Sequence, residues 1–335
     1  MPRSSLIIEI SISVLLSFLS GYLMLLVMGY DASRVFTIVL SDALRNPHYL
    51  MIRSTPLILT ALAFSIPSLT GVFNIGGEGQ FYLGALLSLM VSYLLGSSPL
   101  ALATGCASGG LLGLVIALIR VRRGVNEVVT SIMLNWIIYF LLAYSVTMHL
   151  YDPMMPYQSV SVPKAARIGN LDLGPVSVPL IFPIAVLTSI AMYFVIFHSS
   201  LGYEMRVVGS SPKSARYAGF NPERVIVISM ALGGAMSGLG GSLLILGHTH
   251  SIDSTMSGLY GMGFAGIGAG LLGRNNPVGI VLSSMFLSLL IIGGEAAELR
   301  AGVPTELADV FIGIIVIVLS IPHLARVIVS RRVAS

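Results

Sequence analysis

The sequence predicts an all-α polytopic membrane protein, and three observations support this fold class. Hydrophobic residues occupy 55% of the 335 positions, and only 10% of the residues are charged, whereas a soluble domain carries about 25% charged residues. The mean hydropathy of the whole chain is +0.92. The apolar residues are also gathered into runs close to the ~20 residues that a membrane-spanning helix needs.

Ten apolar runs are candidate transmembrane helices within a single membrane domain over residues 1–335. Several runs are short and rich in glycine, so one or two are expected to be broken or re-entrant. The first run is longer than a signal-peptide core and lacks an A-x-A cleavage site, which predicts a retained span. The candidates are Leu6–Met28, Thr55–Phe73, Phe81–Leu95, Leu100–Ile119, Val128–Leu150, Val176–Phe197, Val225–Leu246, Ser257–Leu272, Val278–Gly293 and Leu307–Ile321.

The distribution of Lys and Arg among the loops predicts the orientation. If all ten runs span and the N-terminus is cytoplasmic, two thirds of the 18 Lys and Arg residues lie on the cytoplasmic side, as the positive-inside rule requires. Both termini are then cytoplasmic. The loop 151–175, rich in proline and polar residues, is the longest outer loop, and the polar stretch 201–224 faces the cytoplasm.

The stretch 201–224 has the signals of a short capped helix. Ser211 is a good N-cap residue, and Pro212 suits the first helical position, where no backbone hydrogen bond is lost. Gly219 suits the position after the helix, where φ is positive. We therefore predict a helix over Pro212–Ala218, and a structured polar helix in a membrane protein's loop is expected to bind a partner.

A glycine-rich break with polar side chains follows the second run. Asn74, Glu78 and Gln80 lie in NIGGEGQ, between two apolar segments. A carboxylate at membrane depth is costly unless it is paired or hydrated, so it is a functional candidate by default. The alternative is a tight turn at the cytoplasmic face with a solvated glutamate.

Two further candidates lie on the run Val128–Leu150. Asn135 is surrounded by apolar residues and needs a hydrogen-bond partner, which is either a neighbouring helix or a passing solute. Trp136 can stack on a base or a sugar, although a tryptophan in a span more often serves packing. The predicted solute path therefore consists of Asn74, Glu78, Gln80, Asn135 and Trp136.

Glycines recur at every fourth position in three runs and predict close helix packing without saying anything about a solute. They are Gly105, Gly109 and Gly113, then Gly234 and Gly238, then Gly266 and Gly270.

Several site classes are disfavoured. Cys106 is the single cysteine, so neither an internal disulfide nor a cysteine metal cluster is expected. His248 and His250 form an H-x-H pair near Asp253, which fits a solvated loop better than a metal site because further ligands are missing. The positive residues are spread among loops, which does not indicate nucleic-acid binding. No catalytic residue, metal or cofactor is predicted.

The two lysines, Lys164 and Lys213, do not follow glycine, so the chain contains no Walker A loop. If transport is driven by ATP, a separate subunit must bind and hydrolyse it.

The chain resembles the permease subunits of prokaryotic ABC importers for branched-chain amino acids, simple sugars and nucleosides, most of all the longer permease of purine-nucleoside importers. The blocks that carry the resemblance lie within residues 55–321 and are GVFNIGGEGQFYLGA from Gly71, GVNEVVTSIMLNW from Gly124, VVGSSPKSARYAGFNPERV from Val207 and GMGFAGIGAGLLGRNNPVGI from Gly261.

This resemblance implies a multi-pass protein of a prokaryotic plasma membrane with three kinds of partner. They are an ABC ATPase subunit, a paralogous second permease that forms a heterodimer, and an extracellular lipid-anchored substrate-binding protein. It also makes 212–219 the coupling helix that contacts the ATPase. The residues concerned are Ser211, Pro212, Ala215, Arg216, Tyr217 and Gly219, with Ser211 where asparagine is usual and Ser214 where alanine is usual.

The function predicted on this basis is the translocation path of a nucleoside importer. Asn74, Gln80 and Asn135 are neutral, which suits an uncharged solute. A simple-sugar permease is the alternative within the family. A proton-coupled secondary carrier with Glu78 as the proton site is a third hypothesis, which the structured cytoplasmic helix disfavours. A fourth, an intramembrane enzyme, lacks the H-E-x-x-H and G-x-S-x-G motifs.

Overall fold

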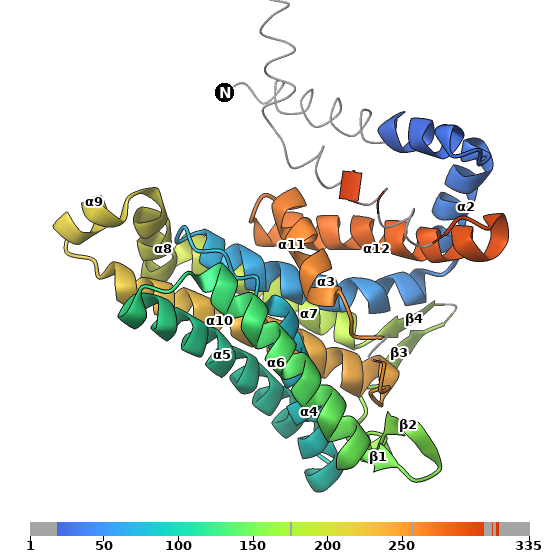
Figure 1. Ribbon diagram of the computed structural model, residues 1–335, viewed down its shortest axis with the longest axis horizontal. Coiled ribbons are helices and arrows are strands. Elements are labelled where there is room, and N and C mark those ends of the chain that lie inside the picture. Colours follow the sequence, from blue (N-terminus) through green and yellow to red (C-terminus); the bar gives the residue numbers. More distant parts are fainter. Residues whose placement is uncertain (1–18, 175, 256–257, 305–309, 311–312, 315–335) are drawn as a thin grey trace, which may run out of the picture. The chain divides into compact units, whose positions relative to one another are not determined.

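The computed structural model describes residues 19–174, 176–255, 258–304, 310 and 313–314 (Figure 1). The chain forms two compact units. One comprises residues 51–284, and the other combines residues 1–50 with residues 285–335. The first unit holds the candidate site.

Helices make up most of the described chain. The helices are α2 (Ala32–Arg45), α3 (Pro47–Ser68), α4 (Gly77–Leu95), α5 (Ser98–Arg123), α6 (Glu127–Met148), α7 (Ile181–His198), α8 (Ser200–Ser210), α9 (Pro212–Tyr217), α10 (Pro222–Leu244), the π-helical turn η2 (Ile245–Thr249), α11 (Met262–Leu272) and α12 (Pro277–Ala301). The remaining elements are the strands β1 (Tyr151–Asp152), β2 (Met155–Ser159), β3 (Asn170–Leu173) and β4 (Val176–Pro179), with the 3₁₀ turn η1 (Lys164–Ala166).

Six helices in the described part of the chain are long and apolar enough to cross a membrane, which confirms a helical polytopic membrane protein. They are α3, α5, α6, α7, α12 and α10 with its π-helical extension. Of the predicted span Leu6–Met28, only residues from 19 onward are described, and residues 19–27 are helical. The predicted span Leu307–Ile321 lies almost wholly outside the described residues.

Four predicted spans have boundaries that differ by five residues or more from the observed helices. α3 runs from Pro47 to Ser68 instead of Thr55–Phe73, and α12 continues to Ala301 instead of ending at Gly293. In the predicted span Ser257–Leu272, the helix begins only at Met262, because Gly261 takes a φ of +79° that ends the preceding turn, and α11 has 11 residues. In the predicted span Val176–Phe197, residues Val176–Pro179 form β4, and α7 begins at Ile181. Hydropathy shows that a run is apolar but does not show where the helix within it begins.

The predicted outer loop 151–175 is structured. It contains the antiparallel hairpin β1–β2 and the first strand of a second antiparallel hairpin, β3–β4, in which Asn170 pairs with Pro179 and Leu173 with Val176. Gly174 lies in the turn with a φ of +71°, a backbone conformation that glycine adopts without strain. The loop also contacts η2, since Ile168 N–H donates to the Leu246 carbonyl at 2.9 Å.

The predicted glycine stripes form the centre of the unit 51–284. α10 makes its most extensive contacts with α5, and α4 packs against both helices. A Cβ added at Gly109 would collide with the Gly234 carbonyl and lie 2.8 Å from Gly238 Cα, and one added at Gly84 would collide with Gly238. These helices therefore touch backbone to backbone, as expected where small residues replace the hydrophobic effect in lipid.

α11 also packs closely on α3, with its glycines against side chains of α3. A Cβ at Gly266 would collide with the Thr60 side chain, and one at Gly270 would lie 2.8 Å from Ser65 Oγ. Thr60 Oγ1 also donates to the Met262 carbonyl at 3.1 Å.

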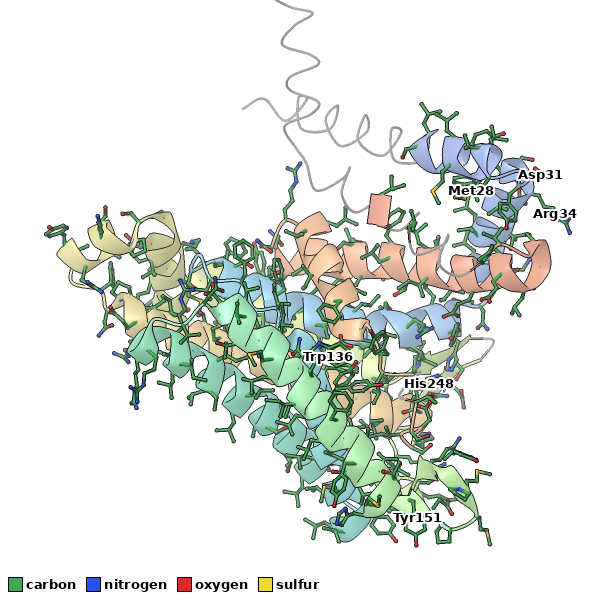
Figure 2. All side chains as sticks on the ribbon, viewed as in Figure 1. Met28, Asp31, Arg34, Trp136, Tyr151 and His248 are labelled. Atoms are coloured by element: carbon green, nitrogen blue, oxygen red, sulfur yellow. The ribbon has the colours of Figure 1, made fainter. Side chains whose placement is uncertain are left out.

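In the other unit, polar contacts fix both ends of α2. Asp31 caps its N-terminus by accepting from Arg34 N–H at 3.1 Å (Figure 2). Asp42, near its other end, pairs with Arg300 of α12 at 2.7 Å.

Candidate functional site

The site is built around the break between α3 and α4. Asn74 and Gln80 are both buried, and their amides bind each other, with Asn74 Nδ2 donating to Gln80 Oε1 at 3.0 Å and Gln80 Nε2 donating to Asn74 Oδ1 at 3.2 Å. Asn74 also donates to the Ala63 carbonyl at 3.0 Å and accepts from Gly76 N–H at 3.1 Å. These two side chains hold the broken backbone in place.

Asn135 of α6 satisfies the other side of the break. Its Oδ1 accepts from Gly79 N–H at 2.8 Å, and its Nδ2 donates to the Ile75 carbonyl at 2.9 Å. A Cβ at Gly79 would lie only 2.7 Å from that Oδ1, so glycine is required for this approach. The predicted need of Asn135 for a partner is confirmed, and the partner is the backbone of the break.

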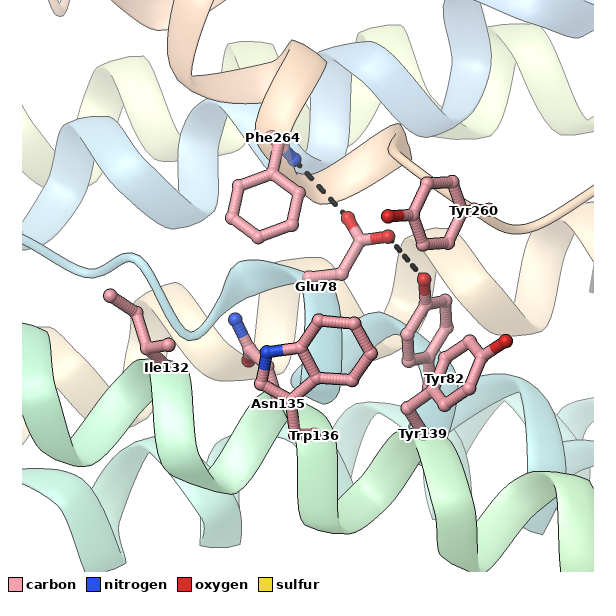
Figure 3. Close-up of a pocket in the computed structure, with 8 residues that line it drawn as sticks. All are labelled: Glu78, Tyr82, Ile132, Asn135, Trp136, Tyr139, Tyr260 and Phe264. Atoms are coloured by element: carbon pink, nitrogen blue, oxygen red, sulfur yellow. Dashed lines mark hydrogen bonds between the residues drawn. The ribbon is translucent and has the colours of Figure 1, made fainter.

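Glu78 begins α4 and caps a second helix. Its side chain is only 2% exposed. Oε1 accepts from the Tyr82 hydroxyl and from Gly261 N–H at 2.6 Å, and Oε2 accepts from Gly263 N–H at 2.5 Å and Phe264 N–H at 3.2 Å (Figure 3). The N-terminal N–H groups of a helix lack intrahelical partners, so the carboxylate satisfies the start of α11.

A pocket of about 310 Å³, open mouth included, lies beside this cap (Figure 3). Three separate segments line it, namely the first turns of α4, the middle of α6 and the start of α11. The lining residues are Glu78, Tyr82, Ile132, Asn135, Trp136, Tyr139, Tyr260 and Phe264.

Aromatic rings dominate the wall of the pocket. Tyr139 is central, with ring centroids 5.5 Å from Trp136, 6.1 Å from Tyr82 and 6.4 Å from Tyr260. Most of these rings meet edge to face, which is a favourable arrangement for aromatic pairs. Trp136 is 51% exposed, so much of its indole surface is free to contact a further group.

Three of the five predicted path residues line the pocket, and two do not. Glu78, Asn135 and Trp136 line the pocket, whereas Asn74 and Gln80 are outside its lining and bind each other. The sequence does not single out Tyr82, Tyr139, Tyr260 or Phe264. The spacing offers one signal, since Tyr82 lies four residues after Glu78 and so on the same helical face.

The predicted capped helix over residues 212–218 is confirmed as α9. Ser211 Oγ accepts from Ser214 N–H at 3.2 Å, and Pro212 occupies the first turn. Gly219 follows the helix with a φ of +88°. The helix ends at Tyr217, one residue before the predicted end.

The side chains of α9 point in two directions. Ala215 is 0% exposed, whereas Tyr217 is 94% exposed. Arg216 pairs with Glu223 at the start of α10, which closes the turn on one side. Because Tyr217 contributes almost no contact to the fold, α9 presents a large amphipathic side chain to its surroundings.

The H-x-H pair does not form a metal centre in the described part of the chain, where no group of three or more His, Cys, Asp or Glu side chains is placed to hold a metal. His248 belongs to η2 (Figure 2). His250 follows it with a φ of +57°. Burial and the nearby positive charge of Arg167 lower the pKa of His250 and so favour its neutral imidazole.

Comparisons with known proteins agree with this architecture. The chain is 31% identical to a guanosine ABC transporter permease protein of Bacillus subtilis, over 96% of this chain and 94% of that one. It is 30% identical to a glucose ABC transporter permease protein of Haloferax volcanii, over 92% and 85% of the two chains. A nucleoside ABC transporter permease protein of Lactococcus lactis is 28% identical, over 96% and 92%.

No solved structure matches the chain. A family model does match it over residues 46–320, which include α3 to α12 and every residue of the pocket. The chain therefore belongs to the family described as the permease component of branched-chain amino acid transport systems.

Proposed function

We propose that the aromatic pocket is part of the path by which this chain carries nucleosides in an ATP-driven importer. As a member of its family, the chain is the permease subunit of an ABC transporter and a multi-pass protein of the plasma membrane. The observation that carries the nucleoside assignment is the set of aromatic side chains around the pocket. Each stacked base gains roughly 1–3 kcal/mol from such a ring.

The polar groups of the pocket suit weak binding. Asn135 and Glu78 already use their hydrogen-bonding capacity on the backbone around them. A solute in the pocket therefore meets mainly ring faces and few free polar partners. A path must release its solute as readily as it takes it up, and stacking without tight polar recognition meets that requirement.

Two relatives support nucleosides, since their names give guanosine and nucleosides as the transported solutes. A third relative of similar identity is named as a glucose permease, so simple sugars are the second candidate. Aromatic faces also bind sugars, so the two candidates must be separated by measurement.

We further propose the partners and topology that such a permease requires. α9 contacts a separate ATPase subunit, and an extracellular lipid-anchored binding protein delivers the solute. A paralogous second permease completes the path, as the paired guanosine permeases of B. subtilis and nucleoside permeases of L. lactis suggest. Ten spans with both termini in the cytoplasm accommodate this arrangement.

Uptake of labelled guanosine by cells that express the whole transporter tests the proposal. Replacing Trp136 by alanine is expected to lower uptake about tenfold, because a stacking surface worth roughly 1–3 kcal/mol is lost. The matched control is Tyr144→Ala, an exposed aromatic residue on the same helix outside the pocket. Unlabelled nucleosides should compete and glucose should not. Equal uptake by the two variants, or competition by glucose alone, would contradict the proposal.

A further inference from the structure

Four groups donate hydrogen bonds to the Glu78 carboxylate. The donors are the Tyr82 hydroxyl and the backbone N–H groups of Gly261, Gly263 and Phe264. An ionised carboxylate accepts only, so four donors match this form of the side chain. Three of the donors belong to the start of α11, where the helix dipole also favours a negative charge.

Glu78 is the one charged residue among the eight that line the pocket, and the other seven are neutral. An ionised Glu78 therefore places a negative charge in the pocket wall, and no positive residue lines the same wall. The basic Arg120 at the end of α5 pairs with Glu127 instead.

This arrangement affects anions in two ways. A helix N-terminus attracts phosphate and other anions through its free N–H groups, but here Glu78 occupies those groups. An anionic solute in the pocket also meets the charge of Glu78. At ~6 Å and an effective dielectric constant of ~20, that repulsion lowers the occupancy of a singly charged anion on the order of 10- to 100-fold.

We propose that Glu78 is a specificity-determining residue, whose carboxylate on the start of α11 makes the pocket reject anionic solutes. If the proposed function holds, the path accepts nucleosides and excludes their phosphates at the permease itself, in addition to any selection by a binding protein. Only the exclusion of nucleoside phosphates rests on the proposed function. The effect of the Glu78 carboxylate on anions in the pocket does not depend on which solute is transported.

Thiol reactivity measures this charge directly. Ile132 lines the pocket, and replacing it by cysteine in a Cys106→Ala background gives this chain a single thiol, whose modification is followed on the permease chain itself. The purified transporter, with its partner subunits, is treated with neutral methyl methanethiosulfonate and with the anionic sulfonatoethyl reagent. The ratio of the two rates cancels differences in thiolate content. We expect Glu78→Gln to raise the anionic rate relative to the neutral rate at least tenfold.

Two controls separate charge from structure. Glu78→Asp keeps the charge and should keep the low ratio. Ile137→Cys places the thiol on α6 outside the pocket lining, where Glu78→Gln should not change the ratio. An unchanged ratio at position 132 in an assembled Glu78→Gln transporter would overturn the inference.

If Glu78→Gln does not assemble, ionic strength provides the test in the unaltered pocket. Raising the salt concentration should increase the anionic rate at position 132 relative to the neutral rate, because salt screens the charge, and a salt-independent ratio would overturn the inference. Neither measurement requires transport. A charge effect on the thiol together with normal guanosine uptake by Trp136→Ala would therefore refute the proposed function and leave this inference standing.

Discussion

At the scale of single residues, buried polar side chains act on backbone groups more than on one another. Asn135 and Glu78 each satisfy backbone atoms that a broken helix leaves unpaired. The sequence is sufficient to predict that both are buried and need partners. It does not reveal those partners, because Gly79 is 56 residues from Asn135 and Gly263 is 185 residues from Glu78.

Replacing Asn135 by alanine should destabilise the permease by about 2–6 kcal/mol, because the Gly79 N–H and the Ile75 carbonyl lose their partner. Each unsatisfied buried group costs roughly 1–3 kcal/mol. Thermal unfolding of the detergent-solubilised protein measures the effect. Ser145→Ala, at a half-buried position on the same helix whose hydroxyl donates only within the helix to the Leu141 carbonyl, should change the midpoint much less. Similar midpoints for both variants would show that Asn135 is not needed to hold the break.

At the scale of elements, apolar runs and glycine spacing predict most helices and their close packing. The predicted helix over Val128–Leu150 matches α6 within two residues at each end. The failures occur where the backbone breaks inside an apolar run. Residues 258–261 precede α11 without being helical, and Val176–Pro179 pairs as a strand. Gly261 and Gly174 lie at these places with a positive φ, but a glycine in the sequence does not by itself reveal which φ it adopts.

Gly109→Ala should weaken the contact of α5 with α10, because its Cβ would collide with the Gly234 carbonyl and approach Gly238 Cα to 2.8 Å. Backbone atoms cannot move aside as side chains do, and overpacking of this kind costs roughly 1–3 kcal/mol. The neighbouring Gly110→Ala is the matched control, since its Cβ would meet the Ala231 carbonyl at 3.2 Å and Ala235 Cβ at 3.4 Å. We expect a lower unfolding midpoint for Gly109→Ala than for Gly110→Ala, and the reverse order would exclude backbone contact as the basis of this packing.

At the scale of the whole molecule, the pocket arises from segments that no local pattern connects. Tyr82, Tyr139 and Tyr260 come from three parts of the chain, and only their assembly brings the ring centroids of Tyr82 and Tyr260 to 6.1 Å and 6.4 Å from that of Tyr139. The helix α9 was predictable because its signals lie within nine residues, from Ser211 to Gly219. Local capping interactions can thus be predicted from the sequence, whereas a binding surface built from distant elements cannot.

Tyr217 allows the proposed assembly with an ATPase to be tested without disturbing the fold. Its side chain is 94% exposed, so Tyr217→Ala should leave the unfolding midpoint unchanged. If α9 binds the ATPase, losing a tyrosine from that interface should weaken the complex by roughly 1–3 kcal/mol, because tyrosine is among the residues that dominate binding energy. The amount of ATPase that co-purifies with the tagged permease should fall about tenfold, together with ATP-driven uptake.

Tyr157→Ala, which removes a 79% exposed tyrosine from β2, is the control and should retain the ATPase. Full retention by Tyr217→Ala would place the ATPase contact elsewhere. Loss from both variants would point to a general effect of removing exposed tyrosines.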